Sequence, residues 1–311
     1  MIKKKLFKYG SVFMCAALMA CSFAACGTNT SSAVQNEVAA NEQDTDTETM
    51  IADVLTSQLS SAPKVATEAK TDSKEETVFV FTKADGQQDH VIVNEKLKNV
   101  TGKSSITDVS SLSNITNLTG DETSTTNGNS LTWAADGNSI TYQGTTTQTA
   151  PVSMKVTYYL DGKEVTPEEL AGKSGEVTIR FDYTNNQKVT AKIDGKDEDI
   201  YVPFMAVSGM ILGDEFSDIE VENGKVISDG SNNVVVGYAL PGLKESLNVK
   251  DDDFDGDVTI PDYVEVKAKV ENFKLDTTMT VVMNATNFIS ADSDNDTSKL
   301  DEVFDTLADA M

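Results

Sequence analysis

The stretch EVTIRFDY, residues 176–183, alternates apolar and polar side chains along its whole length. The apolar members are Val177, Ile179, Phe181 and Tyr183, and the polar members are Glu176, Thr178, Arg180 and Asp182. Successive side chains of a β-strand point to opposite faces of the sheet, so this period of two predicts a strand. One face of the strand lies on a core and the other in water, which is typical of antiparallel sheets.

Similar apolar segments occur on both sides of this stretch. They are TVFVF (77–81), HVIV (90–93), VSMKVTYYL (152–160), VVVGYAL (234–240), YVEVKAKV (263–270) and TMTVVM (278–283). Asp-Gly and Asn-Gly pairs, which favour tight turns, recur between such segments. They predict three hairpins: 77–93 around Asp85-Gly86, 130–144 around Asp136-Gly137, and 218–228 around Asn223-Gly224. The polar stretch between the first two predicts surface loop with brief strands.

Helical signals are few in the same region. Residues 165–175 predict one short helix, with Thr166 as N-cap and Pro167 in the first turn. Many strands without a long helix favour an antiparallel sandwich over a parallel α/β sheet. The apolar segment 200–212 is interrupted by Pro203 and Gly209, and it predicts a buried strand pair too short to span a bilayer.

Charge and motifs exclude two classes of ligand. The chain carries 25 Lys and Arg against 50 Asp and Glu, a net charge of −25, which repels nucleic acid phosphates. The Gly-Lys-Ser at 172–174 lacks the earlier Gly of a phosphate-binding loop, because Pro167 stands there. We therefore expect no nucleic acid and no nucleotide as a partner.

The first 25 residues predict a lipoprotein signal peptide. Four Lys precede an apolar segment that ends in FAACG, so Cys26 is the expected lipidated first residue of the mature chain. Cys21, at the end of LMAC, is the alternative, and a plain secretory signal is a second one. All three cysteines lie at or before Cys26, so the exported body has no disulfide.

The remaining chain divides by composition. The predicted parts are a disordered stalk (26–74), a β-hairpin-rich module (75–150), an antiparallel β-sandwich module (151–290) and the start of a coiled-coil-like helix (291–311). The stalk is rich in Thr, Ser, Asn and Glu, which bury too little apolar surface to offset ordering entropy. The predicted fold class is thus mainly β, with one large or two small β modules in a sandwich-like ectodomain.

The last residues, SKLDEVFDTLADAM, have the spacing of one apolar helix face. Leu300, Val303, Phe304 and Leu307 form this expected partner-helix face. The helix either begins a coiled coil that is cut short or docks on the β domain or on a partner helix. A frayed end with a fortuitous pattern is the remaining interpretation, since so short a helix is marginal alone.

One acidic stretch resembles a metal-binding loop. Asp251, Asp253, Asp255 and Asp262 match ligand positions of a calcium loop, with Gly256 at the turn. Pro261 and a predicted strand replace the helix that normally follows such a loop. A solvated acidic turn is the favoured interpretation, so we expect no cofactor and keep calcium as the alternative.

Catalytic signals are weak. His90 is the only histidine, so any Ser-His-Asp or Cys-His site would depend on it, and an ordinary strand residue is the favoured interpretation. Cys26 would carry lipid. Paired carboxylates are available in any chain this acidic, so their presence does not distinguish a glycoside hydrolase from a non-catalytic protein. We therefore expect no enzyme, and the alternative is a surface hydrolase that acts on cell-envelope carbohydrate through two carboxylates.

Several segments together resemble a known family. They are YYLDGKEVTPEELAGKSGEVTIRFDYTNNQ (158–187), ALPGLKESLNV (239–249), IPDYVEVKAKVENFKLDTTMTVV (260–282) and the last residues, 298–311. These look like the extracellular region of phage-infection-protein-like surface proteins of Gram-positive bacteria, whose β-rich ectodomain leads into X-X-X-Leu-X-X-Gly heptads. Val303 and Ala310 stand where Gly usually would, and no further heptads or membrane segments follow.

The resemblance implies a receptor or an accessory of a membrane or secretion system, and it carries over no catalytic residue. Together with the leader, it predicts a lipid-anchored, non-catalytic ectodomain on the outer face of the cytoplasmic membrane. The expected partners are the membrane, through the lipid, and a protein, through the C-terminal helix.

Overall fold

The computed structural model describes residues 72–193, 195–228, 233–248, 260–275 and 278–285. The predicted leader, the C-terminal helix and the stalk up to residue 71 lie outside these residues, whereas Ser73 and Lys74, predicted as the end of the stalk, belong to the first strand. Within them the chain is mainly β, with antiparallel pairing throughout and only short helices. No helix in this part of the chain is long and apolar enough to cross a membrane.

The largest sheet has eight strands. In spatial order these are β15 (Gly224–Ser228), β16 (Asn233–Ala239), β13 (Phe204–Leu212), β18 (Thr278–Asn284), β1 (Ser73–Thr82), β2 (Gln88–Lys98), β7 (Ile140–Thr146) and β4 (Ser113–Asn117). The first predicted hairpin is confirmed, since β1 pairs with β2 across the turn at Asp85-Gly86. Strands from before and after residue 150 share this sheet, so the expected boundary between two modules does not separate the sheets.

The second sheet has five strands and is centred on the stretch that predicted it. Its order is β14 (Phe216–Glu222), β17 (Tyr263–Val270), β10 (Gly175–Asn185), β8 (Val152–Leu160) and β9 (Lys163–Val165). The predicted alternation is confirmed: Val177, Ile179 and Phe181 of β10 are buried. On the wet face, Arg180 pairs with Asp182 and lies 3.7 Å from the ring centroid of Tyr263.

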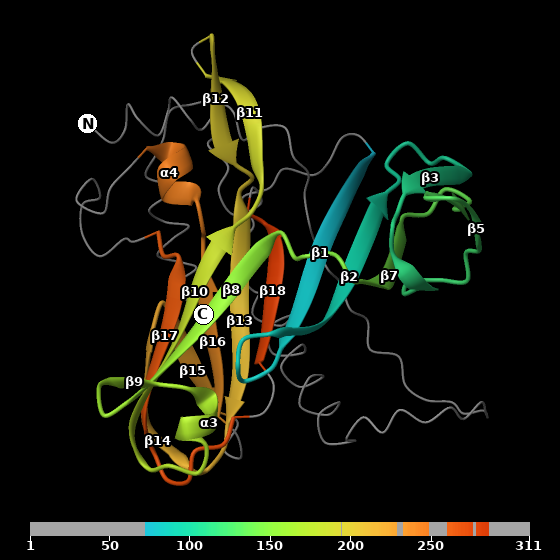
Figure 1. Cartoon of the computed structure of the whole chain (residues 1–311). Helices are drawn as coiled ribbons and strands as arrows, with labels where there is room; N and C mark the ends of the chain where they lie inside the picture. The colour runs from blue at the N-terminus through green and yellow to red at the C-terminus, as the bar shows by residue number, and fades with distance from the viewer. Residues whose placement is uncertain (1–71, 194, 229–232, 249–259, 276–277, 286–311) are drawn as a thin grey trace, which may run out of the picture.

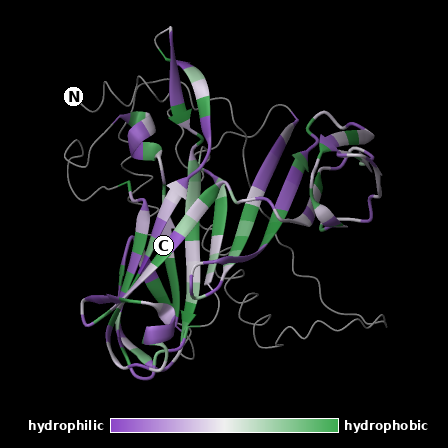
Figure 2. Cartoon of the chain, in the orientation of Figure 1, coloured by the Kyte–Doolittle hydropathy of each residue, from purple (hydrophilic) through white to green (hydrophobic). Residues whose placement is uncertain are grey.

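The two sheets pack face to face as a sandwich-like core. Val80, Val93 and Val282 from the larger sheet and Ile179 and Val266 from the smaller belong to one buried apolar cluster. Figure 2 shows hydrophobic residues along the strands of this sandwich. Burial of these alternate side chains is the main driving force for the fold, because no disulfide is expected in the exported body.

Two smaller sheets extend from the sandwich (Figure 1). One is a hairpin of β11 (Lys188–Ile193) and β12 (Lys196–Tyr201). The other, which we call the three-stranded sheet, has the order β3 (Ser105–Val109), β6 (Ser130–Ala134) and β5 (Ser124–Asn127). These short strands confirm the expectation of brief strands in the polar stretch between the first two predicted hairpins.

The other two predicted hairpins are wrong, and for one reason. Asp136-Gly137 joins β6 to β7, and Asn223-Gly224 joins β14 to β15, but each pair of strands lies in two different sheets. The chain turns at both places: the Asn138 N–H donates to Ala135 O at 2.7 Å, and Asn223 has a positive φ of 59°. Which sheet each strand joins depends on where its apolar side is buried, and Trp133 of β6 packs on Tyr142 of β7 across that gap.

The short helices are α3 (Pro167–Leu170) and α4 (Leu243–Leu247). The predicted cap of α3 is confirmed: the Glu169 backbone N–H donates to Thr166 Oγ1 at 3.3 Å, and the Thr166 N–H donates to Glu169 Oε2 at 3.0 Å. The segment 200–212 forms the end of β12 and all of β13, separated at Pro203. Gly209 does not interrupt β13, because it pairs with Val236 and Met279.

Candidate functional site

The candidate site lies where β1 and β2 lose their apolar pattern. Val78 and Val80 of β1 face the sandwich core, but the same side of the strand carries Lys74 and Glu76 nearer its start. Glu76 pairs with Glu95 of β2, so charged side chains meet on the core-facing side. Figure 2 shows these ends of β1 and β2 as hydrophilic.

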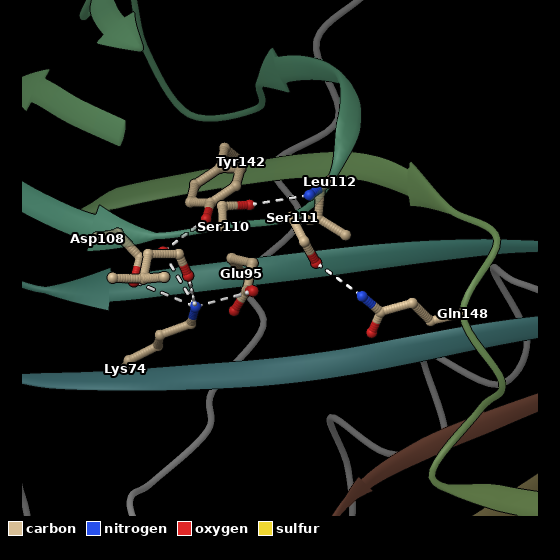
Figure 3. A network of polar contacts seen from close by, with 9 residues as sticks. Lys74, Glu95, Asp108, Ser110, Ser111, Leu112, Tyr142 and Gln148 are labelled. Carbon is tan, nitrogen blue, oxygen red and sulfur yellow. Dashed lines mark hydrogen bonds and ion pairs between the residues drawn. The ribbon is translucent and has the colours of Figure 1, made fainter. Parts of the chain in front are cut away.

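Four strands place a polar network here, which we call the Lys74 network: Lys74 of β1, Glu95 of β2, Asp108 of β3 and Tyr142 of β7 (Figure 3). Lys74 Nζ lies 3.0 Å from Glu95 Oε1 and donates to Asp108 Oδ2 and Oδ1 at 3.0 and 3.1 Å. The Tyr142 hydroxyl donates to Asp108 Oδ2 at 2.6 Å. The network therefore ties the three-stranded sheet to the eight-stranded sheet.

Burial controls the electrostatics of the network. The side chains of Glu95 and Asp108 are only 4% and 9% exposed. Burial raises the pKa of Glu95 to about 7, and the hydrogen bond from Lys74 offsets only part of this effect. Burial alone would lower the pKa of Lys74, but its bonds to Glu95 and Asp108 raise it on balance. Burial and the bond to Asp108 also raise the pKa of Tyr142.

An apolar cluster lies beside the network and fixes the position of Tyr142. Leu97, Leu131, Trp133 and Ile140 are buried in it together with Tyr142. The rings of Trp133 and Tyr142 lie 5.4 Å apart between centroids, with a tilt of 35° between their planes. The three-stranded sheet is thus held by an apolar contact and by a buried ion pair at the same junction.

A pocket of about 180 Å³ opens next to the network. Lys74 and Glu95 line it, together with Ser111, Leu112 and Gln148 from neighbouring connections. Gln148 Nε2 donates to Ser111 Oγ at 3.2 Å (Figure 3). The pocket is smaller than the roughly 300–1,000 Å³ usual for small-molecule sites. Its size and polar lining suit a few water molecules or one small polar group.

A second buried carboxylate lies on the opposite side of β1. The Glu75 side chain is fully buried and forms an ion pair with Lys98 of β2. Ion pairs therefore hold β1 on both of its sides, through Lys74 on one and Glu75 on the other. At the start of β1, charged side chains therefore lie on both faces of the larger sheet.

Of the residues singled out from the sequence, His90 is described by the structure. It lies on β2 and stacks on Phe81, with ring centroids 4.3 Å apart and 9° between the planes. His90 Nδ1 lies 2.9 Å from Asp89 Oδ2. The two residues border an open groove of about 570 Å³ near the other end of β2 from Glu95.

The other singled-out residues lie mostly outside the described residues. These are Cys21, Cys26, Asp251, Asp253, Asp255, Leu300, Val303, Phe304 and Leu307. Asp262 is described and is exposed, directly before β17. Within the described ranges no three His, Cys, Asp or Glu side chains are grouped so that they could hold a metal ion. For 251–262 the solvated acidic turn stays the prediction, with calcium binding as its alternative.

Sequence reasoning missed the Lys74 network. The predicted stalk includes Lys74, and Asp108 lies in a stretch expected to be surface loop. A signal was present in β1, where Glu76 and Lys74 continue the alternation of Val80 and Val78 in charged form. Charges on the core-facing side of a strand indicate that partners lie nearby, but the sequence does not say which acids approach Lys74.

Comparisons with known proteins found no match to a family model, to a curated protein or to a solved structure.

Proposed function

We propose that the chain is a lipid-anchored cell-surface protein whose folded part is a non-catalytic interaction domain. The observation that carries the proposal is the leader: basic residues, an apolar segment and FAACG ending at Cys26, followed at once by polar chain. Two or more acyl chains on such a cysteine hold a protein on a membrane almost permanently. The resulting location is the outer face of the cytoplasmic membrane.

The length of chain before the first described strand fits this proposal. Between Cys26 and β1 lie residues 27–72, which reach up to about 150 Å if fully extended. A body on such a tether can contact envelope components or proteins well away from the bilayer. The acidity of the chain suits a soluble, non-aggregating surface in that position.

The three-stranded sheet is suited to contact such a partner. It extends from the sandwich (Figure 1), and its strand β5 is fully exposed and pairs only with β6 among the described strands. A free strand edge offers backbone groups to an added strand of a partner protein. The Lys74 network and the Trp133 contact hold this edge firmly, so that little order is lost on binding.

The resemblance to phage-infection-protein-like ectodomains supports a role as a receptor or as an accessory of a membrane or secretion system. It adds the C-terminal helix as a second contact, either with the β domain or with a partner helix. The partner we propose is a protein, and the membrane is contacted through the lipid alone.

The test is replacement of each candidate cysteine. In cells fed a labelled fatty acid, the Cys21→Ser chain should keep the label and stay with the membrane fraction. The Cys26→Ser chain should lose the label and be retained as a precursor or released into the medium. Labelling of Cys26→Ser but not of Cys21→Ser would move the anchor to Cys21. No label on the natural chain would refute the proposal.

One observation favours the alternative, a hydrolase acting on envelope carbohydrate. Glu95 has the raised pKa that a general acid needs, and it borders a pocket. Lys74, however, lies 3.0 Å from both Glu95 and Asp108 and occupies the space between the two carboxylates. Release of soluble sugar from purified envelopes by the natural chain, but not by a Glu95→Gln chain, would establish the alternative.

A further inference from the structure

The eight-stranded sheet has a second apolar side, which faces away from the five-stranded sheet and which we call the outer face. Its side chains include Phe79, Phe81, Ile92, Met205, Val207, Val236, Tyr238, Met279, Val281 and Met283. The pairing register places Ile92, Phe79, Val281, Val207 and Tyr238 in one row across five neighbouring strands. Figure 2 shows β13 and β18 as hydrophobic along most of their length.

Eight of these ten side chains are buried, and those of Phe79 and Ile92 are half-buried. Met205, Val207 and Met279 have no exposed surface, and Val281 has 1%. The apolar cluster shared by the two large sheets contains inner-face residues such as Val80 and Val282, so the five-stranded sheet covers the opposite side from the outer face. Neighbouring strands alone leave the tips of such side chains open to water, so the outer face requires a covering layer.

We propose that residues 298–311 of the same chain dock as a helix on the outer face. This inference goes beyond the proposed function, and it does not depend on the lipid anchor. The apolar stripe of Leu300, Val303, Phe304 and Leu307 then faces the sheet, and the segment is ordered by that contact.

The path of the chain permits this docking. β18 runs through the middle of the outer face and ends at Asn284. Residues 286–297 span up to about 40 Å when extended, so the helix can start at any point along the strand. A helix over 298–311 is about 21 Å long, and the seven residues of β18 extend about 23 Å. The two lengths match when the helix lies along the strand.

Charge distinguishes 298–311 from 50–59, another apolar segment that could cover the outer face. Three lysines have the strand parity of the outer face, Lys96 and Lys98 on β2 and Lys225 on β15, against one acid, Glu75 of β1, which pairs with Lys98. They lie toward opposite edges of the apolar area. The segment 298–311 carries four acids and one lysine, whereas the apolar segment 50–59 carries the single acid Asp53. The attraction of acidic helix flanks to basic rims therefore favours 298–311.

The test is cross-linking within the full chain. Replacing Cys15, Cys21 and Cys26 by Ser leaves introduced cysteines as the only thiols. We expect a short bis-maleimide to join Phe304→Cys to Phe79→Cys within one molecule, seen as a shifted monomer band. The matched control is Val80→Cys, the next residue of β1, which faces the inner core and should not react with Phe304→Cys.

Every other outcome contradicts the proposal. A Leu55→Cys chain that joins to Phe79→Cys, while Leu300→Cys, Phe304→Cys and Leu307→Cys do not, would assign the face to 50–59. A dimer band would assign the outer face to a second copy of the chain.

A second measurement avoids changes in the sheet. If 298–311 docks on the outer face, Phe304→Asp should raise the rate of hydrogen exchange in both 298–311 and β18. Unchanged exchange in β18 would overturn the docking.

Discussion

Replacing Lys74 by Met should destabilise the junction of the two sheets, and the loss should depend strongly on pH. Met keeps the length and apolar stem of Lys74 but removes the cation that contacts both Glu95 and Asp108. Each carboxyl must then stay charged in a buried site or bind a proton. The loss in the free energy of unfolding equals the smaller of these two costs, that of burying the charge or that of binding the proton.

The structure gives the size of this effect. Removing one partner of a buried ion pair costs about 3–5 kcal/mol of stability. The carboxyl left behind can bind a proton instead, which limits this cost to about 1.4 kcal/mol for each unit by which the pH exceeds its ordinary pKa. For Glu95, with an ordinary pKa of about 4.5, the limit is about 5 kcal/mol at pH 8 and about 1 kcal/mol at pH 5. Lys74 is 36% exposed, so solvent screens part of the interaction. We expect a loss of about 3 kcal/mol at pH 8 and about 1 kcal/mol at pH 5.

Urea unfolding followed by tryptophan emission measures this directly, because Trp133 is the only tryptophan and packs on Tyr142 of the network. The matched control is Lys192→Met, which removes a pair with Asp197 whose members are 73% and 63% exposed. That control should change the free energy of unfolding by less than about 1 kcal/mol at either pH. A Lys74→Met loss equal at pH 5 and pH 8, or no larger than that of the control, would refute the reasoning.

Two further predictions concern the same fold. The folded-state pKa of Glu95 is raised to about 7, so its contribution to stability is complete below its ordinary pKa and is lost as the pH rises through 7. The natural chain should therefore lose up to about 2 kcal/mol of stability from this group between pH 5 and pH 8. Glu95→Gln should abolish that loss in the same urea assay. A pH profile of stability that is unchanged in Glu95→Gln would contradict this. A Cβ at Gly237 of β16 would overlap Val264 Cγ1 of the facing sheet, so Gly237→Ala should lower the free energy of unfolding by about 1–3 kcal/mol. Adding Val264→Ala should recover part of that loss, and additive losses in the double variant would show that the contact is not the cause.

Local structure was predictable from the residues because it follows from backbone geometry. Val177, Ile179 and Phe181 alternate with polar residues, and they are buried on one side of β10 as the period of two requires. Thr166 caps α3 because a hydroxyl one residue before Pro167 can accept a free backbone N–H. In each case the residues that decide the structure lie within a few positions of each other.

The candidate site was not predictable in the same way. Lys74 and Asp108 are separated by 34 positions, and Tyr142 donates to Asp108 across another 34. Nothing in the spacing of such residues shows that they meet. The charged positions of β1 indicate that partners are needed, and only the placement of the three-stranded sheet supplies them.

The sequence by itself determined the strands, the turns, the short capped helix and the expectation of an exported, anchored chain. The tertiary structure decided which strands share a sheet. The chain turns at Asp136-Gly137 and at Asn223-Gly224 as expected, yet each turn joins strands that belong to two different sheets. Turns and strands depend on neighbouring residues, whereas the choice of sheet depends on which distant apolar surfaces are buried together, and that is a property of the whole fold.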